Sequence, residues 1–416
     1  MKPPIYLDYQ ATTPLAPEAA AAMRPWLETA FGNPHSGHRM GREAAAAVEV
    51  ARERVVEALA APLPAREGLG VGTSEARSSR RPGSREPASS RPAPDPPLPP
   101  PLHAGELYFT SGATEAINWA LKGVASRLPP DRRRIVTLAT EHAAVLDTVG
   151  YLSSLGFDAE ILPVAPDGLA DLAAVGAALE QPTGLVSAML VNNEIGVVQP
   201  VAQIAALARR AGALFFCDAV QGLGRVSVPL ADCDLVAVSA HKVHGPKGVG
   251  ALWVRHGVEL DPLLHGGGQE GGLRSGTLSP ALCVGFGEAA RLIIERAEAD
   301  RDHVERLWER ALQLMSGWAL NGSAEHRYRG NLNLRRDGVD SARLISELRT
   351  IAFSAGSACA SGSGRPSHVL DALGLGDRQA RSSLRLGFGR HTSEEDLVSA
   401  LMLIDDAASR QLNFAA

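Results

Sequence analysis

Short apolar runs alternate along most of the chain with longer segments that are rich in alanine and leucine. We predict strands over the apolar runs 106–112, 134–140, 184–192, 212–219, 234–242 and 250–255. The segments between them, such as "VAQIAALARRAGA", have the apolar spacing that is typical of helices. This alternation predicts an α/β fold, with a mostly parallel sheet that helices cover on both faces.

One segment, residues 63–104, breaks this pattern. It is dense in Pro, Ser, Arg and Gly and contains no aromatic residue. Such a segment buries too little apolar surface to offset the entropy lost when its backbone is ordered. We therefore expect a disordered surface insertion. The alternatives are a docking arm for a partner and a stretch that is absent from the translated protein.

Composition and charge narrow the class of protein. The 416 residues are 45% hydrophobic, which is enough for a sizeable core, and carry 41 basic and 46 acidic side chains. Charges so nearly balanced give no reason to expect a nucleic-acid or anionic-membrane surface. The N-terminus has no apolar signal core, and no apolar run reaches the roughly 18 residues of a membrane span. We predict a soluble, cytoplasmic protein.

The cysteines are few and far apart. Cys217, Cys233, Cys283 and Cys359 have neither the paired spacing of zinc sites nor that of a disulfide framework, which favours a reducing compartment and no resident metal. Cys359 lies in "SAGSACASGSG", whose small residues predict a flexible loop. Its thiol is either incidental or a reactive sulfur on an arm that moves, and the loop alone does not distinguish these readings.

Polar residues follow most of the predicted strands. In "TSGATEA", small residues before a predicted helix allow the backbone to approach a phosphate, although the same stretch also fits an ordinary helix cap. His142 follows the second strand, where it could transfer protons, stack on a ring or be structural. Asn193 and Glu194 follow the next strand. Because ligands of such sheets bind beyond the carboxyl ends of the strands, we predict one site there.

Asp218 and Lys242 indicate the chemistry of this site. Asp218 follows the apolar run "LFFC", where an unpaired carboxylate would be costly. Lys242 also ends an apolar run, so it either pairs with Asp218 or is desolvated enough to form a Schiff base. A Schiff-base lysine, an acid partner for a pyridinium nitrogen and a phosphate cradle are the pattern of pyridoxal phosphate sites.

A series of segments resembles, in order, the signature blocks of the NifS/IscS-type cysteine desulfurases. These segments are "YLDYQATTP", "FGNP", "TSGATEA", "TEHAAVLDT", "VNNEIGVVQP", "DAVQ", "SAHKVHGPKGVGALWVR", "HGGGQE", "LRSGT", "SAGSACAS" and "SSLRLGFGRHT". That family belongs to the class-V aminotransferases, pyridoxal-phosphate enzymes of fold type I. The resemblance runs from Ile5 to about Ile404 and leaves only residues 63–104 unmatched.

The resemblance implies an architecture and a set of cofactor contacts. It implies a seven-stranded sheet in a large domain, 16–262, and a smaller α+β domain formed by 1–15 and 263–416. Lys242 would hold the cofactor as a Schiff base and move the Cα proton. The other expected cofactor residues are Asp218 at the ring nitrogen, Gln221 at the ring hydroxyl, His142 on the ring face, and Asn193. The phosphate would be bound by Ala113, Thr114, Ser239 and His241, joined by Thr277 from the second subunit of a homodimer.

The resemblance also implies a substrate and a reaction. Asn193 and Arg385 would bind the carboxylate of L-cysteine, a task for which a planar guanidinium is well suited. The thiolate of Cys359 would take the substrate sulfur as a persulfide, release alanine and deliver the sulfur to an acceptor protein. The acceptor would be an iron–sulfur scaffold or a thiolation relay, and Cys359 could ligate iron or a cluster transiently during transfer. The spacing from Cys359 to "PSHVL" resembles the long-loop branch of the family.

Gly271 departs from the family pattern, because an arginine is usual at that position. The absence of this arginine is expected to weaken the positioning of the substrate or of the loop. Two other functions compete with this interpretation. A selenocysteine lyase, or another lyase of the same fold, would share Lys242 and Asp218 but would not need Cys359 in a long loop. A catalytically silent paralogue could serve as an interaction subunit, although the joint presence of Lys242, Asp218, His142, Arg385 and Cys359 argues against it.

Overall fold

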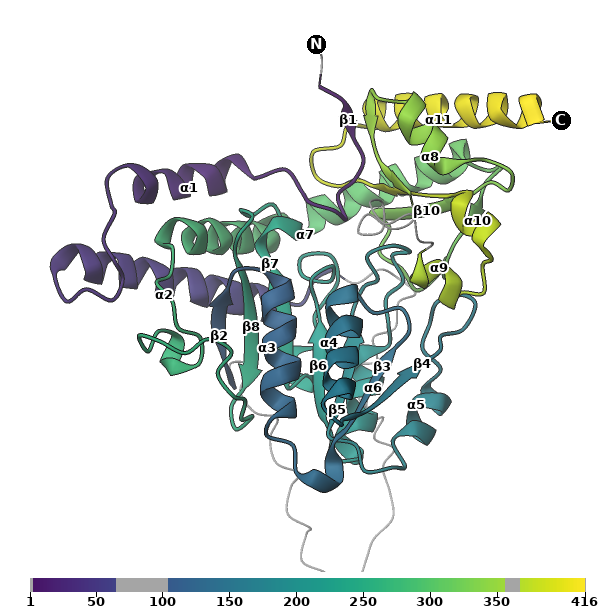
Figure 1. Cartoon of the computed structure of the whole chain (residues 1–416). Helices are drawn as coiled ribbons and strands as arrows, with labels where there is room; N and C mark the ends of the chain where they lie inside the picture. Colours follow the sequence, from purple (N-terminus) through teal and green to yellow (C-terminus); the bar gives the residue numbers. More distant parts are fainter. Residues whose placement is uncertain (1–2, 65–103, 356–366, 416) are drawn as a thin grey trace, which may run out of the picture.

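The computed structural model describes residues 3–64, 104–355 and 367–415 (Figure 1). Two features predicted from the sequence lie largely or wholly outside these ranges. They are the insertion, of which residues 65–103 are not described, and the loop with Cys359, of which residues 356–366 are not described.

A seven-stranded sheet forms the centre of the molecule, in the strand order β2-β8-β7-β6-β5-β3-β4. Only β8 runs antiparallel to its neighbours, which confirms the mostly parallel sheet that the alternating pattern predicted. The strands are β2 (Gly105–Thr110), β3 (Arg134–Leu138), β4 (Asp158–Leu162), β5 (Leu185–Met189), β6 (Leu214–Asp218), β7 (Leu235–Ser239) and β8 (Gly250–Arg255).

The sequence pattern missed β4, the strand at one edge of the sheet. Its sequence, "DAEIL", alternates charged and apolar residues and leaves Ile161 half exposed. An edge strand pairs on one side only and can carry charges, so it lacks the continuous apolar run by which the buried strands were recognised.

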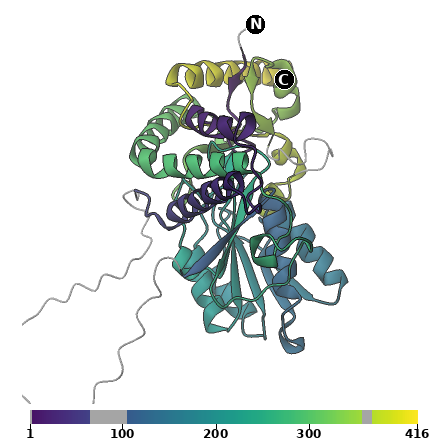
Figure 2. The same cartoon turned by 90° about the vertical axis from the view of Figure 1, so that its left-hand side faces the viewer.

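Helices cover both faces of the sheet. On one face, α3 (Ala113–Ala125) and α4 (Ala143–Ser154) pack on residues such as Leu235 and Phe216. The other face is covered by α2 (Arg39–Ala60), α5 (Leu172–Ala178), α6 (Val201–Arg210) and the first half of α7 (Pro280–Leu314). The helices α1 (Pro17–Glu28), α2 and α7 lie side by side at one flank (Figure 2).

A second apolar core lies at the end of the molecule where the N-terminal and C-terminal elements meet (Figure 1). It is built on the four-stranded sheet β12-β13-β10-β9. These strands are β9 (Ala319–Leu320), β10 (Asn331–Arg335), β12 (Ser354–Ala355) and β13 (Ser383–Gly387); beside them, β1 (Ile5–Tyr6) pairs in parallel with β11 (Ile351–Ala352). The helices of this part are α8 (Ser341–Glu347), α9 (His368–Ala372), α10 (Asp377–Arg381) and α11 (Glu394–Ala415).

The long helix α7 belongs to both cores. Phe286 and Ile293 in its first half pack with the central sheet, whereas Leu307 and Trp308 in its second half pack with α11 and β13. The domain division at residues 16 and 262 stays a prediction. Short 3-10 helices occupy Pro130–Arg132, Leu230–Asp232, Ala240–Lys242 and Glu270–Gly272. Among the described helices, none has the length and apolar character that crossing a bilayer requires.

Candidate active site

A cavity of about 570 Å³ opens at the carboxyl ends of the central strands. It gathers side chains from the turns after β2, β3, β5, β6 and β7, together with one from β13. The residues predicted from the sequence that line it are Ala113, Thr114, His142, Asn193, Asp218, Gln221, Ser239, His241, Lys242 and Arg385. Thr277 does not line it and is exposed, and Cys359 lies outside the described residues.

The start of α3 forms one wall of the cavity. Helix amides in the first turn have no carbonyl acceptor within the helix, so their N–H groups face the space before Ala113. Gly250 of β8 allows the backbone to close up behind this turn, because a Cβ at that position would lie 2.8 Å from the Cα of Gly112. The turn is fixed from outside by Glu115, which accepts a hydrogen bond from the Ser111 N–H and pairs with Arg274 at 2.7 Å.

Asp218 presents a buried carboxylate to the cavity. It ends β6, and its Oδ1 accepts a hydrogen bond of 2.9 Å from the Val220 N–H. Burial raises the pKa of Asp218, while His142 and Lys242 nearby lower it. A carboxylate in this position therefore favours a cationic group bound beside it.

The amine of Lys242 is directed toward the N-terminal segment. Its Nζ donates hydrogen bonds to the carbonyl oxygens of Gln10, at 2.6 Å, and Ala11, at 2.9 Å. The Gln221 side chain donates to the same Gln10 oxygen at 2.9 Å. The segment Gln10–Thr12 thus lines the cavity. The sequence interpretation missed this, although the block "YLDYQATTP" was the available signal.

The surroundings of two histidines in the cavity determine where they carry protons. His142 precedes α4, and its Nδ1 accepts the Ala144 N–H at 3.1 Å, so this nitrogen carries no proton. Burial lowers the pKa of His241 to about 4, and Lys242 and Lys247 add to the effect, so His241 is neutral at pH 7. Next to it, the Ser239 Oγ is buried and has no hydrogen-bond partner among the described residues.

Arg385 closes the cavity on the side of β13. Its side chain is 1% exposed and lies between the Asp8 carboxylate, at 2.7 Å, and the Asn193 carbonyl, at 3.1 Å. Asp8 is a further residue that the sequence interpretation did not single out. The Asp8 carboxylate and the Asn193 carbonyl each accept a hydrogen bond from a different terminal nitrogen of the guanidinium, which fixes its orientation.

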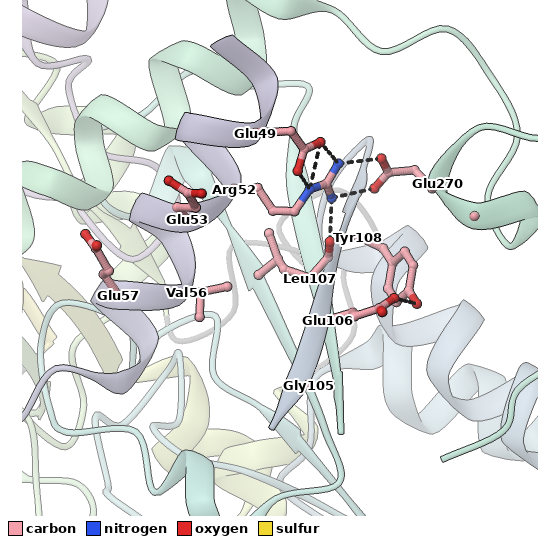
Figure 3. A pocket seen from close by; sticks show the side chains of 11 residues that line it. Glu49, Arg52, Glu53, Val56, Glu57, Gly105, Glu106, Leu107, Tyr108 and Glu270 are labelled. Carbon is pink, nitrogen blue, oxygen red and sulfur yellow. Dashed lines mark hydrogen bonds and ion pairs between the residues drawn. The ribbon is translucent and has the colours of Figure 1, made fainter. Parts of the chain in front are cut away.

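A second cavity, of about 640 Å³, lies between α2 and β2 (Figure 3). Arg52 crosses it and donates to both carboxylate oxygens of Glu270, at 2.7 and 2.9 Å. Gly271 lines this cavity and not the one that contains Lys242. Its φ of 65° lies in the left-handed region that favours glycine, and among the described residues only its own chain neighbours have atoms within 4 Å of a Cβ placed there.

Known proteins similar to this chain fit these observations. The family model described as aminotransferase class-V matches residues 5–66 and 102–400. A cysteine desulfurase IscS of Rickettsia bellii is 40% identical over 96% of this chain and 90% of its own length. A solved NifS-like protein superposes with a TM-score of 0.81 at 32% identity, covering 98% of this chain and 99% of its own. A structure of SspA in complex with cysteine has a TM-score of 0.74 at 31% identity and covers 92% and 98%, respectively.

Proposed function

The chain belongs to the cysteine desulfurases of the class-V aminotransferase family, and from this premise we propose how its own residues desulfurate L-cysteine. The products are L-alanine and a persulfide on Cys359. The observation that carries the proposal is one cavity that holds the Asp218 carboxylate, the Lys242 amine and the Arg385 guanidinium.

The cavity fits pyridoxal 5'-phosphate. The buried Ser239 hydroxyl has no partner among the described residues, and it stands with Thr114 and the start of α3 where a phosphate would find donors. The buried Asp218 carboxylate suits a protonated ring nitrogen. When bound, this cofactor supplies an aldehyde that captures amines and a ring that withdraws electrons from the Cα of an amino acid.

Lys242 would hold the cofactor and then act as the base at the substrate Cα. The Gln10 and Ala11 carbonyls accept hydrogen bonds from its Nζ, and they would hold the amine in the cavity whenever it is not bonded to the cofactor. Arg385 would bind the substrate carboxylate, with Asp8 and the Asn193 carbonyl holding its guanidinium in place. His142 would lie on the ring face, and Gln221 would bond the ring hydroxyl.

Sulfur transfer would use Cys359. Its thiolate forms a sulfur–sulfur bond with the substrate sulfur as the carbon–sulfur bond breaks. The electron pair of the broken bond goes to carbon, which takes up a proton and becomes the methyl group of alanine. The persulfide then passes to an acceptor protein, an iron–sulfur scaffold or a thiolation relay. The SspA structure in complex with cysteine supports L-cysteine as the substrate.

A homodimer in the cytoplasm is part of the proposal. Thr277 is exposed and does not line the cavity of its own chain, which is compatible with a contact to the cofactor phosphate of a second subunit. The free thiols of Cys217, Cys233 and Cys283 are compatible with a reducing compartment.

The experiment is to supply the purified protein with pyridoxal phosphate and L-cysteine and to measure alanine and protein-bound persulfide. Wild type should turn yellow and form both products, and a separate sample treated with borohydride should lose the colour and form neither product. The matched Lys242→Ala variant should form neither. A wild-type protein that binds the cofactor and converts no L-cysteine would overturn the proposal.

A further inference from the structure

Arg225 lies beside the cavity that contains Lys242, in the segment that follows β6, and is not one of the residues that line it. Its half-buried guanidinium stacks over the Tyr328 ring, 5.2 Å from the ring centre. Nη2 donates a hydrogen bond of 3.1 Å to the carbonyl of Lys242. Nη1 donates to the side-chain Oε1 of Gln221 and, at 3.2 Å, to the backbone carbonyl of the same residue. One guanidinium therefore contacts two residues that line the cavity, Gln221 and Lys242.

These contacts fix which way the Gln221 amide faces. The oxygen and the nitrogen of a glutamine amide have nearly the same shape, so the hydrogen-bond partners determine its orientation. A guanidinium only donates, so Arg225 selects Oε1. On the other side, the Gln10 carbonyl only accepts, and it takes a hydrogen bond of 2.9 Å from Nε2. Two neighbours of opposite hydrogen-bonding character thus specify the same orientation.

The orientation determines what Gln221 can offer to a ligand in the cavity. Nε2 carries two hydrogens, and the Gln10 carbonyl takes one of them, which leaves the second for a ligand. An N–H donor stabilises a ligand oxygen that has lost its proton, whereas a carbonyl acceptor in the same place would stabilise a hydroxyl.

Arg225 also brings a positive charge that no carboxylate of the described residues neutralises. Burial lowers its pKa, and Tyr328 counteracts that shift, but an arginine keeps its proton in proteins. The charge acts on the cavity, because it contributes to the low pKa of His241, after burial and the charges of Lys242 and Lys247. A positive charge at this place likewise favours an anionic oxygen on a ligand.

We propose that Arg225 is a positioning residue that makes Gln221 present an N–H group to the ring oxygen of pyridoxal phosphate, and so keeps that oxygen deprotonated. The inference rests on the proposed binding of this cofactor. It goes beyond that proposal, because Arg225 would act through Gln221 and would not touch the cofactor.

The test measures the absorbance of the cofactor-loaded protein without substrate, at one fixed pH. Lysine-bound pyridoxal phosphate is yellow when its ring oxygen is deprotonated and the proton lies on the linking nitrogen, and it absorbs in the near ultraviolet when the ring oxygen carries the proton. Arg225→Met should lower the ratio of yellow to near-ultraviolet absorbance about 10-fold, because the amide can then turn and the charge is lost. Arg225→Lys should keep the ratio within about 2-fold of wild type, because an ammonium is charged and also only donates.

Gln221→Glu tests the same contact with Arg225 intact. A carboxylate offers acceptors only, so this variant should lower the ratio as well, and it keeps the proposal testable should Arg225→Met not fold. Arg132→Met is the matched control. Arg132 is also half-buried and donates to backbone carbonyls, those of Thr183 and Ala211, but it does not line the cavity or contact a residue that does. The ratio in Arg132→Met should match wild type.

The possible failures can be told apart. A wild-type ratio in Arg225→Met or in Gln221→Glu would overturn the positioning role and leave the proposed function standing. An equal loss in Arg225→Lys or in Arg132→Met would show a merely structural role and overturn it too. If wild type itself did not turn yellow with pyridoxal phosphate, the proposed function would fail, and this inference with it.

Discussion

Arg385, which lines the cavity, forms an ion pair of 2.7 Å with Asp8, although the two residues lie near opposite ends of the chain. The Arg385 side chain is buried, and its other contact is the carbonyl of Asn193. The N-terminal segment therefore takes part in the site that the central sheet and β13 build. This pair fixes the orientation of the one guanidinium that we expect to bind the substrate carboxylate.

Asp8→Asn should raise the KM for L-cysteine, because an uncharged amide holds the guanidinium less firmly. We expect a rise of about 3- to 10-fold, up to about 1.4 kcal/mol, with a smaller change in kcat. Steady-state alanine formation measures it. Asp337→Asn is the control, because Asp337 pairs with Arg335 at 3.0 Å and is exposed. A KM that falls or stays constant in Asp8→Asn would show that Asp8 does not position Arg385 for substrate.

Asp218→Asn should weaken cofactor binding and almost abolish alanine formation. The carboxylate is buried, and burial raises its pKa, so a cation beside it is favoured in a way that an amide cannot reproduce. We expect at least about 10-fold weaker binding of pyridoxal phosphate, about 1.4 kcal/mol, by absorbance titration. Unchanged cofactor affinity and turnover in Asp218→Asn would show that Asp218 does not interact with the cofactor ring.

Glu141 should make the stability of the fold depend on pH. Complete burial raises its pKa to about 8, with the nearby Asp218 carboxylate adding to the shift. Between pH 4.5 and 8 the folded protein therefore binds more protons than the unfolded chain, so stability falls as the pH rises through this window. The slope for one group is at most about 1.4 kcal/mol per pH unit.

Glu141→Gln should remove that dependence, because an amide can still accept the Met189 N–H and carries no charge. Its Tm should exceed that of wild type near pH 8 and approach it near pH 5. Scans at a series of pH values under identical conditions measure the difference. Parallel curves for the two proteins would mean that Glu141 does not titrate in this range.

Arg327 should be a stability residue and not a catalytic one. Its guanidinium is buried over the Trp308 ring, and burial lowers its pKa to about 9. It donates hydrogen bonds to four backbone carbonyls, those of Ile195, Asn321, Ser323 and Asn331. Arg327→Met should cost roughly 3–5 kcal/mol, because the carbonyls lose their donors. Urea unfolding measures it, with the exposed Arg343→Ala as the control. A loss below 1 kcal/mol, about the size of a surface change, would contradict this role.

Much of the fold could be predicted from the sequence, because a buried strand contains a local run of apolar residues. The strands buried on both faces are visible in the sequence as apolar runs. Residues at the ends of these runs, such as Asp218 and Lys242, lie together at the carboxyl ends of the strands because of the topology alone. The edge strand β4 carries charges and therefore has no such apolar run.

The contacts that the sequence interpretation missed join segments that are far apart in the chain. The Lys242 amine meets the carbonyls of Gln10 and Ala11, and Arg385 meets Asp8, through backbone positions and pairings that no local pattern encodes. Periodicity reports which face of an element is buried, but not which distant segment covers it.

The central claim is that Cys359 receives the sulfur, and the most direct test follows persulfide and alanine in wild type and Cys359→Ser. Both proteins, loaded with pyridoxal phosphate, are mixed with excess L-cysteine. We predict that Cys359→Ser keeps the yellow colour and the spectral change on substrate binding, carries no persulfide and releases at least about 100-fold less alanine, close to 2.7 kcal/mol in barrier. Alanine release by Cys359→Ser at the wild-type rate would contradict the account.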